Sequence, residues 1–309
     1  MVSCDAYYIS KMIPEISYED AICSIGLNNG VFDLNYDGND VYMMKSRYIS
    51  TPQMLLDSLE IDYQKLEIEE LFNPLSDLSK VLVFLPKILL DNLDIIHEDT
   101  KQLAISLSTF VPRLTQTGSL ELTGMEPTEI EYTVEVTREQ LEKLATIEMK
   151  PAMDSVFIVR LNGSSISEDK IRENVRESMT ACLVDYDGID NGALIWYGGQ
   201  YGYKKLTELI KDFSSFDETE KKILMGTMVA GSNFMHRKEY WEALQKRDYL
   251  DLQQLNNLRV SGGLWRKVVR TLINHVCYGQ EINAEEMSNV LERIASIELE
   301  AFSYIKENI

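Results

Sequence analysis

The chain has 309 residues, of which 45% are hydrophobic and 26% charged, enough to bury one large core or two ordinary ones. Fifty acidic residues against thirty basic ones give a formal net charge of −20, which argues against nucleic acid as a partner. The longest apolar run, Val81 to Leu85, is too short to cross a bilayer, and the first residues lack the pattern of a signal peptide. We therefore expect a cytoplasmic protein with no membrane association.

The four cysteines are Cys4, Cys23, Cys182 and Cys277. No two of them have the spacing of a metal knuckle or a CxxC pair, and the three histidines are dispersed, so we expect no metal site and no cofactor. Buried, inert thiols are the expected state of these side chains. Cys4 is the exception because it precedes a predicted helix, whose macrodipole lowers the pKa of a thiol at its N-terminus.

Three helices are predicted near the N-terminus. The first covers residues 5–13 and stops at Pro14. The second starts near Ser17, which stands at capping-box spacing from Asp20. The third covers residues 51–59 and has a proline at its first position.

Four segments of the N-terminal half resemble strands: residues 80–85, 103–108, 119–123 and 131–136. The second and third flank a Thr-Gln-Thr-Gly turn, and Thr137 is predicted to cap a helix that ends near Ala145. This mixture ends at Lys150, which predicts an α+β domain over residues 1–150 and a mostly helical domain over residues 151–309.

After a predicted strand over residues 155–161, helical periodicity dominates the chain. One helix is predicted over residues 203–213, and a longer one over residues 217–235, where Gly226 and other small residues indicate a closely packed face. Asn283 is predicted to cap the final helix. Its apolar stripe consists of Met287, Val290, Leu291, Ile294, Ala301, Phe302 and Ile305.

Basic residues cluster in this half at Arg237-Lys238, at Lys246-Arg247, and at Arg266-Lys267 with Arg270. Two interpretations are open. The clusters are either a solvated helix surface or a docking patch for an acidic partner.

Three segments together resemble one protein family. The first is Cys4 with its helix, followed by Ile16-Ser17-Tyr18-Glu19-Asp20 and Gly26-Leu27-Asn28-Asn29-Gly30-Val31-Phe32. The second is Tyr197-Gly198-Gly199-Gln200-Tyr201-Gly202 with Leu206-Thr207-Glu208-Leu209-Ile210-Lys211-Asp212-Phe213, and the third is Gly231-Ser232-Asn233-Phe234-Met235-His236-Arg237-Lys238-Glu239-Tyr240. In this order, over nearly the whole chain, they resemble the butirosin biosynthesis protein H family.

The resemblance implies an α+β fold in which a papain-like N-terminal domain is fused to a mostly helical domain. It also implies a cysteine-dependent acyltransferase of specialised metabolism, such as antibiotic biosynthesis. Cys4 would take an acyl group from the phosphopantetheine thioester of an acyl or peptidyl carrier protein and pass it to a small amine. A homo-oligomer is left open.

The family pattern places a histidine at the start of a strand and an Asp or Asn at the end of the next strand. Gln102 stands at the matching histidine position and becomes a candidate substrate-binding residue. The next predicted strand ends at Thr123-Gly124 without an acid. His97 is then the candidate base that deprotonates Cys4, from a loop.

This departure supports an alternative in which the papain-like domain is catalytically degenerate and binds a carrier protein or a metabolite. Trp196 and Tyr201 are candidates to line such a pocket, although core or interface packing also accounts for them. Arg237 is a candidate contact for a carboxylate or for the phosphopantetheine phosphate, because arginine suits bidentate anion contacts.

Overall fold

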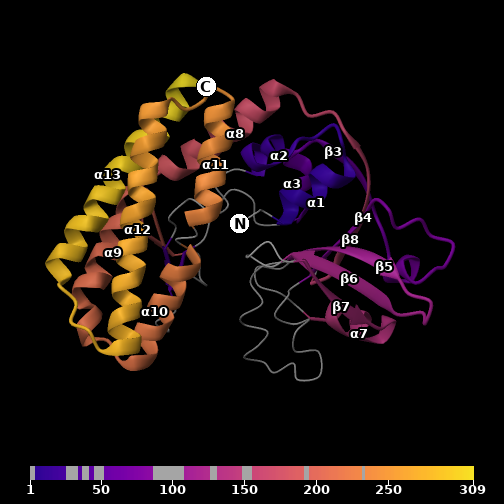
Figure 1. Ribbon diagram of the computed structural model, residues 1–309, viewed down its shortest axis with the longest axis horizontal. Coiled ribbons are helices and arrows are strands. Elements are labelled where there is room, and N and C mark those ends of the chain that lie inside the picture. Colours follow the sequence, from indigo (N-terminus) through magenta and orange to yellow (C-terminus); the bar gives the residue numbers. More distant parts are fainter. Residues whose placement is uncertain are drawn as a thin grey trace. The chain divides into compact units, whose positions relative to one another are not determined.

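The chain forms two compact units, each built from two stretches of sequence (Figure 1). The sheet unit comprises Met1–Ser24 and Ile49–Glu168, and the helical unit comprises Ile25–Tyr48 and Asp169–Ile309. This computed structural model describes residues 4–25, 34–36, 42–44, 52–85, 108–125, 131–147, 155–190, 195–231 and 234–309.

The sheet unit is built on six antiparallel strands in the order β3-β8-β4-β5-β6-β7. In chain order these are β3 (Ile61–Lys65), β4 (Val81–Leu85), β5 (Ser108–Leu114), β6 (Leu120–Met125), β7 (Glu131–Val136) and β8 (Phe157–Ser164). The mixture of this sheet with helices confirms the expected α+β class.

Strand β4 lies in the middle of this core, and all five of its residues are buried, as the apolar run predicted. Val81, Val83 and Leu85 belong to one hydrophobic cluster on one face of the sheet. Alternation turns Phe84 to the opposite face, where its ring centroid lies 6.0 Å from that of Phe157. The centre of the sheet is therefore covered on both faces.

Strand β5 runs from Ser108 to Leu114, so it begins at the last residue of the strand predicted over residues 103–108. Residues 103–107 lie outside the described part of the chain. Pro112 lies in β5 and pairs with Leu122 of β6, whereas β4 pairs with β5 only as far as Phe110. The pairing of β4 with β5 ends before Pro112, so the missing N–H of the proline breaks no bond of that ladder.

The described helices that accompany this sheet are α1 (Cys4–Met12), α2 (Tyr18–Ile25), α3 (Pro52–Ser58), α4 (Ile68–Leu71) and α7 (Arg138–Ala145). The predicted caps form. Ser17 and Asp20 exchange two side chain–backbone hydrogen bonds of 3.0 Å at the start of α2. Thr137 and Gln140 do the same at the start of α7, at 2.8 and 3.2 Å. Short polar side chains thus set these helix starts locally.

The helical unit carries a second sheet, of four antiparallel strands in the order β2-β1-β10-β9. These are β1 (Leu34–Tyr36), β2 (Tyr42–Met44), β9 (Tyr186–Asp190) and β10 (Ile195–Gly198). Because β1 pairs with β10, residues from the first fifty of the chain are built into the C-terminal unit.

The rest of this unit is helical, and its elements are α8 (Glu168–Leu183), α9 (Gln200–Asp212), the 3-10 turn η1 (Phe213–Ser215), α10 (Glu218–Gly231), α11 (Phe234–Lys246), α12 (Leu252–Tyr278) and α13 (Ala284–Asn308). The predicted apolar stripe of the final helix is buried throughout. Gly226 differs from its prediction, because it is exposed and no atom lies within 4 Å of a Cβ built there.

Glu298 joins three helices inside the helical unit. This side chain of α13 is 2% exposed and accepts hydrogen bonds from Tyr203 of α9 and from Ser261 and Trp265 of α12. The Trp265 Nε1 to Glu298 Oε1 distance is 2.8 Å. Three donors compensate in part for the loss of hydration that a buried carboxylate suffers.

The predicted boundary at Lys150 lies outside the described residues, and the contacts divide the chain differently. β8 follows that boundary yet pairs with both β3 and β4, so the sheet unit extends to Glu168. Within the part of the chain that the structure describes, no helix has the length and hydropathy needed to cross a bilayer.

A fragment of residues 1–150 lacks β8, which leaves β3 and β4 without the strand between them. We expect this fragment to show no cooperative unfolding transition in urea by circular dichroism. A fragment of residues 1–168 retains β8 and should unfold cooperatively. Equal cooperativity in both fragments would mean that β8 is dispensable and that the boundary at residue 150 is correct.

Replacing Glu298 with Leu removes the acceptor for three buried donors. We expect the Glu298→Leu variant to lose about 3–5 kcal/mol of unfolding free energy. Glu298→Gln should lose about 1 kcal/mol, because its amide oxygen still accepts and its amide nitrogen can donate to Tyr203. Glu292→Leu, on the exposed face of the same helix, is the control in urea unfolding. A loss as large at residue 292 would contradict this role.

Candidate functional site

Cys4 is the first residue of α1, as the sequence predicted. The helix packs on strand β5 of the sheet unit, and Ala6, Ile9 and Ile13 are buried along this segment. The chain thus presents Cys4 at the N-terminal end of a helix that its apolar residues fix to the sheet. The macrodipole at a helix N-terminus lowers the pKa of a thiol, and for Cys4 this stays an expectation.

The next residue, Asp5, attaches this end of α1 to β5. The Thr109 hydroxyl donates a hydrogen bond to Asp5 Oδ1. Burial raises the pKa of the Asp5 carboxyl above its usual value, and the Thr109 hydrogen bond offsets part of this rise. Neither residue was selected from the sequence, because 104 residues separate them. Burial therefore shifts Asp5 toward its neutral form, next to the candidate nucleophile.

The other end of α1 is attached to a different strand. Lys11 Nζ lies 3.7 Å from Glu131 Oε1 of β7 and 4.3 Å from the centroid of the Tyr7 ring. Since β6 lies between β5 and β7, α1 crosses the sheet from β5 at its first turn to β7 at its last. Two polar contacts thus fix how α1 lies across the sheet.

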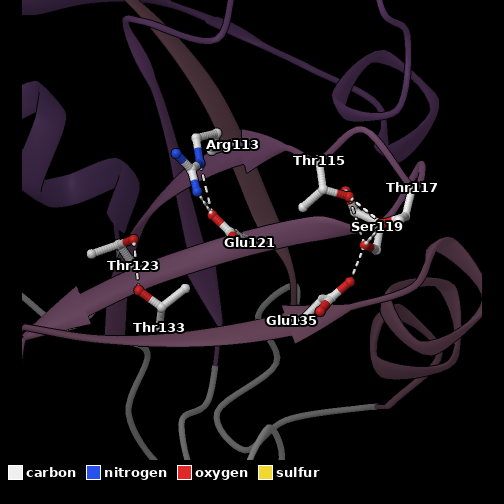
Figure 2. Close-up of polar contacts among 8 residues, drawn as sticks. All are labelled: Arg113, Thr115, Thr117, Ser119, Glu121, Thr123, Thr133 and Glu135. Carbon is white, nitrogen blue, oxygen red and sulfur yellow. Dashed lines mark hydrogen bonds and ion pairs between the residues drawn. The ribbon is translucent and has the colours of Figure 1, made fainter.

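The same face of the sheet continues beyond α1 as a polar surface (Figure 2). Two cross-strand pairs lie on it: Arg113 Nε donates to Glu121 Oε2 at 2.7 Å, and the Thr123 and Thr133 hydroxyls are 3.2 Å apart. At the hairpin, three hydroxyls and a carboxylate form one group, consisting of Thr115, Thr117, Ser119 and Glu135. These side chains largely satisfy one another.

The three other cysteines differ in accessibility. Cys23 is fully buried, and burial raises the pKa of its thiol far above the usual value. Cys182 is 2% exposed, and its Sγ lies 3.0 Å from the Ser178 carbonyl oxygen. Both are the inert thiols that the sequence predicted. Cys277 was expected to be buried as well but is exposed on α12, because it lies on the side of the helix away from the core.

His97 and Gln102 lie outside the described residues, so their roles as candidate base and substrate contact stay predictions. Strand β5 starts at Ser108, not directly after Gln102, and Ser108 pairs with Leu85, the last residue of β4. His97 and Gln102 both belong to the segment between the end of β4 and the start of β5. These two strand ends neighbour the Asp5–Thr109 contact. Residues 103–107 also lie outside the described residues, so the match of Gln102 to the family histidine stays a prediction.

The remaining candidates belong to the helical unit. Trp196 lies in β10 and pairs with Asn35, Tyr201 is a partly buried residue of the first turn of α9, and Arg237 lies in α11. The side chains of Trp196 and Arg237 are outside the description. The binding roles of these three residues stay predictions.

The glycine-rich motif of residues 197–202 has a structural explanation. It forms the turn from β10 into α9, and Gly199 has φ 57° and ψ −137° there. A Cβ at Gly199 would lie 2.2 Å from Asp185 Oδ1, and that oxygen accepts from the Gln200 backbone N–H at 2.8 Å. The glycine thus allows Asp185 to cap α9.

Over the described ranges, no group of three His, Cys, Asp or Glu side chains is arranged to hold a metal ion. No protein-family model matches the chain, and a comparison with curated proteins gave no match either. The family resemblance therefore stays a prediction that depends on the order of its motifs.

The Asp5→Asn variant tests the environment of the site. A raised pKa means that the folded state disfavours the ionised carboxyl, so the wild type loses stability relative to the variant as the pH rises above the usual Asp pKa. Asn keeps an oxygen for Thr109 and removes the charge, so we expect a gain on the order of 1 kcal/mol near pH 7 and little difference near pH 3.

Urea unfolding at both pH values measures this difference. The control is Asp57→Asn, which makes the same change of charge at an exposed position of α3. A variant at residue 5 that is less stable than the wild type near pH 7 would show that the fold stabilises the ionised form of Asp5.

Proposed function

We propose that this protein is a cysteine-dependent acyltransferase that moves an acyl group from a carrier-protein thioester to a small amine. The observation that carries the proposal is the position of Cys4 at the first residue of α1, with the Asp5–Thr109 hydrogen bond fixing that turn to the sheet. The papain-like family resemblance supplies the reaction class.

The electrostatics of the first turn favour a nucleophilic thiolate. The N-terminus of α1 lowers the free energy of a negative charge at Cys4. An ionised Asp5 would oppose this charge, but burial raises the pKa of that carboxyl. The raised pKa therefore weakens the opposition of Asp5 to a thiolate at the neighbouring residue.

The reaction requires two displacements at one carbonyl carbon. In the first, the Cys4 thiolate bonds to the acyl carbon while the bond to the carrier sulfur breaks, and the carrier thiolate takes up a proton. In the second, the amine nitrogen bonds to the acyl carbon, the bond to Cys4 breaks, and the amine proton passes to a base. His97 is the candidate for that base. Neither step changes an oxidation state.

Intact-protein mass spectrometry with a panel of small acyl thioesters tests the proposal. The measurement is made in a Cys277→Ser background, because the exposed Cys277 thiol would otherwise add a second adduct. We expect one acyl mass on this protein, its loss in the additional Cys4→Ala variant, and transfer of the acyl group to an added amine. Replacing His97 with Gln should slow adduct formation by about 100-fold or more near neutral pH.

The absence of any adduct, together with a Cys4 that does not react with iodoacetamide, would overturn the acyltransferase proposal. It would favour the alternative of a catalytically degenerate domain that binds a carrier protein or metabolite. The presence of Gln102 where the family resemblance expects a histidine is the observation behind that alternative.

A further inference from the structure

Helix α12 differs in charge from the rest of this acidic protein. Its 27 residues contain three arginines and one lysine but no aspartate or glutamate, while the whole chain has a formal net charge of −20. The four cations are Arg259, Arg266, Lys267 and Arg270, and all are exposed. Arg266 follows Arg259 by seven residues and Arg270 follows Arg266 by four, which places these three on one side of the helix, away from the buried Trp265.

Neighbouring carboxylates neutralise this basic face only in part. Glu242 of α11 lies 3.2 Å from Arg259 and 3.8 Å from Lys238, so one carboxylate serves two cations. Lys267 pairs with Glu286 of α13 at 2.5 Å. Arg270 is exposed and has no ion pair within the described ranges of the chain. Arg270 is therefore an exposed cation of this face that no carboxylate of the described residues neutralises.

Two adjacent glycines, Gly262 and Gly263, lie in the middle of this continuous helix. No atom lies within 4 Å of a Cβ built at Gly262 or Gly263, so contacts inside the protein do not require them. A glycine inside a helix costs about 1 kcal/mol relative to alanine. Gly263 is exposed between Arg259 and Arg266, where a missing side chain lets a partner approach the helix backbone closely.

We propose that the basic face of α12, formed by Arg259, Gly263, Arg266, Lys267 and Arg270, docks the acidic surface of the carrier protein that delivers the acyl group. The identity of the partner rests on the proposed function, and its acidic character rests on charge complementarity. The net charge of −20 repels an acidic partner, whereas this basic face attracts it, which favours docking here.

Fluorescence anisotropy tests this surface. The labelled probe is a recombinant, acidic acyl carrier protein that carries its phosphopantetheine group. We expect binding at roughly 50 mM NaCl that weakens toward roughly 300 mM, because salt screens exposed charges. Arg270→Gln should weaken binding several-fold and Arg270→Glu about tenfold or more. Arg293→Glu makes the same charge change on the exposed face of α13 and should leave binding within about twofold.

Equal weakening by the Arg270 and Arg293 variants, or no binding of the wild type at low salt, would overturn the docking proposal. So would binding to phosphatidylserine vesicles that depends on Arg270 while carrier binding does not. The Arg270→Glu variant should still be acylated at Cys4 by a small thioester at the wild-type rate. If the wild type is not acylated at Cys4 by any small thioester, the acyltransferase proposal is overturned. The docking proposal is then decided by the binding measurements alone.

Discussion

The architecture depends on two strand pairings that cross the chain. β1 pairs with β10, which builds residues 34–36 into the C-terminal unit, and β8 lies between β3 and β4 in the N-terminal sheet. Each unit is therefore assembled from two separated stretches of sequence. Non-local pairing of this kind requires the chain to close long loops before the pairing stabilises them. The sheet unit then needs the chain as far as Glu168, and the helical unit needs residues from the first fifty of the chain.

Within the helical unit, a buried carboxylate specifies how three helices meet. Glu298 lies in the apolar register of α13 but binds donors from α9 and α12. The charged residue in an apolar stripe was visible in the sequence. Its partners were not, because Tyr203 and Ser261 stand 95 and 37 residues away. The long helix α12 was not predicted either, because Gly262 and Gly263 lower the helix propensity of its middle. Its formation depends on tertiary packing.

We propose chemistry and docking for different parts of this protein. Cys4 belongs to the sheet unit, and the basic face of α12 belongs to the helical unit. The first requires a fixed helix terminus, which the contacts of Asp5 and Lys11 with two strands provide. The second requires exposed cations in a strongly acidic chain. A transferase with a macromolecular donor needs both features, because recognition of the donor and reaction with its acyl group involve different surfaces.

The sequence by itself determined what local interactions control: the caps at Ser17, Thr137 and Asn283, the hairpin turn, the buried run of β4, and Cys4 at a helix start. Side chains bond there to backbone groups three residues away, or apolar periodicity fixes the buried face. Only the tertiary structure decided which strands pair, where the units divide, and that Thr109 meets Asp5. Those contacts join residues far apart in sequence, and no local pattern encodes their register.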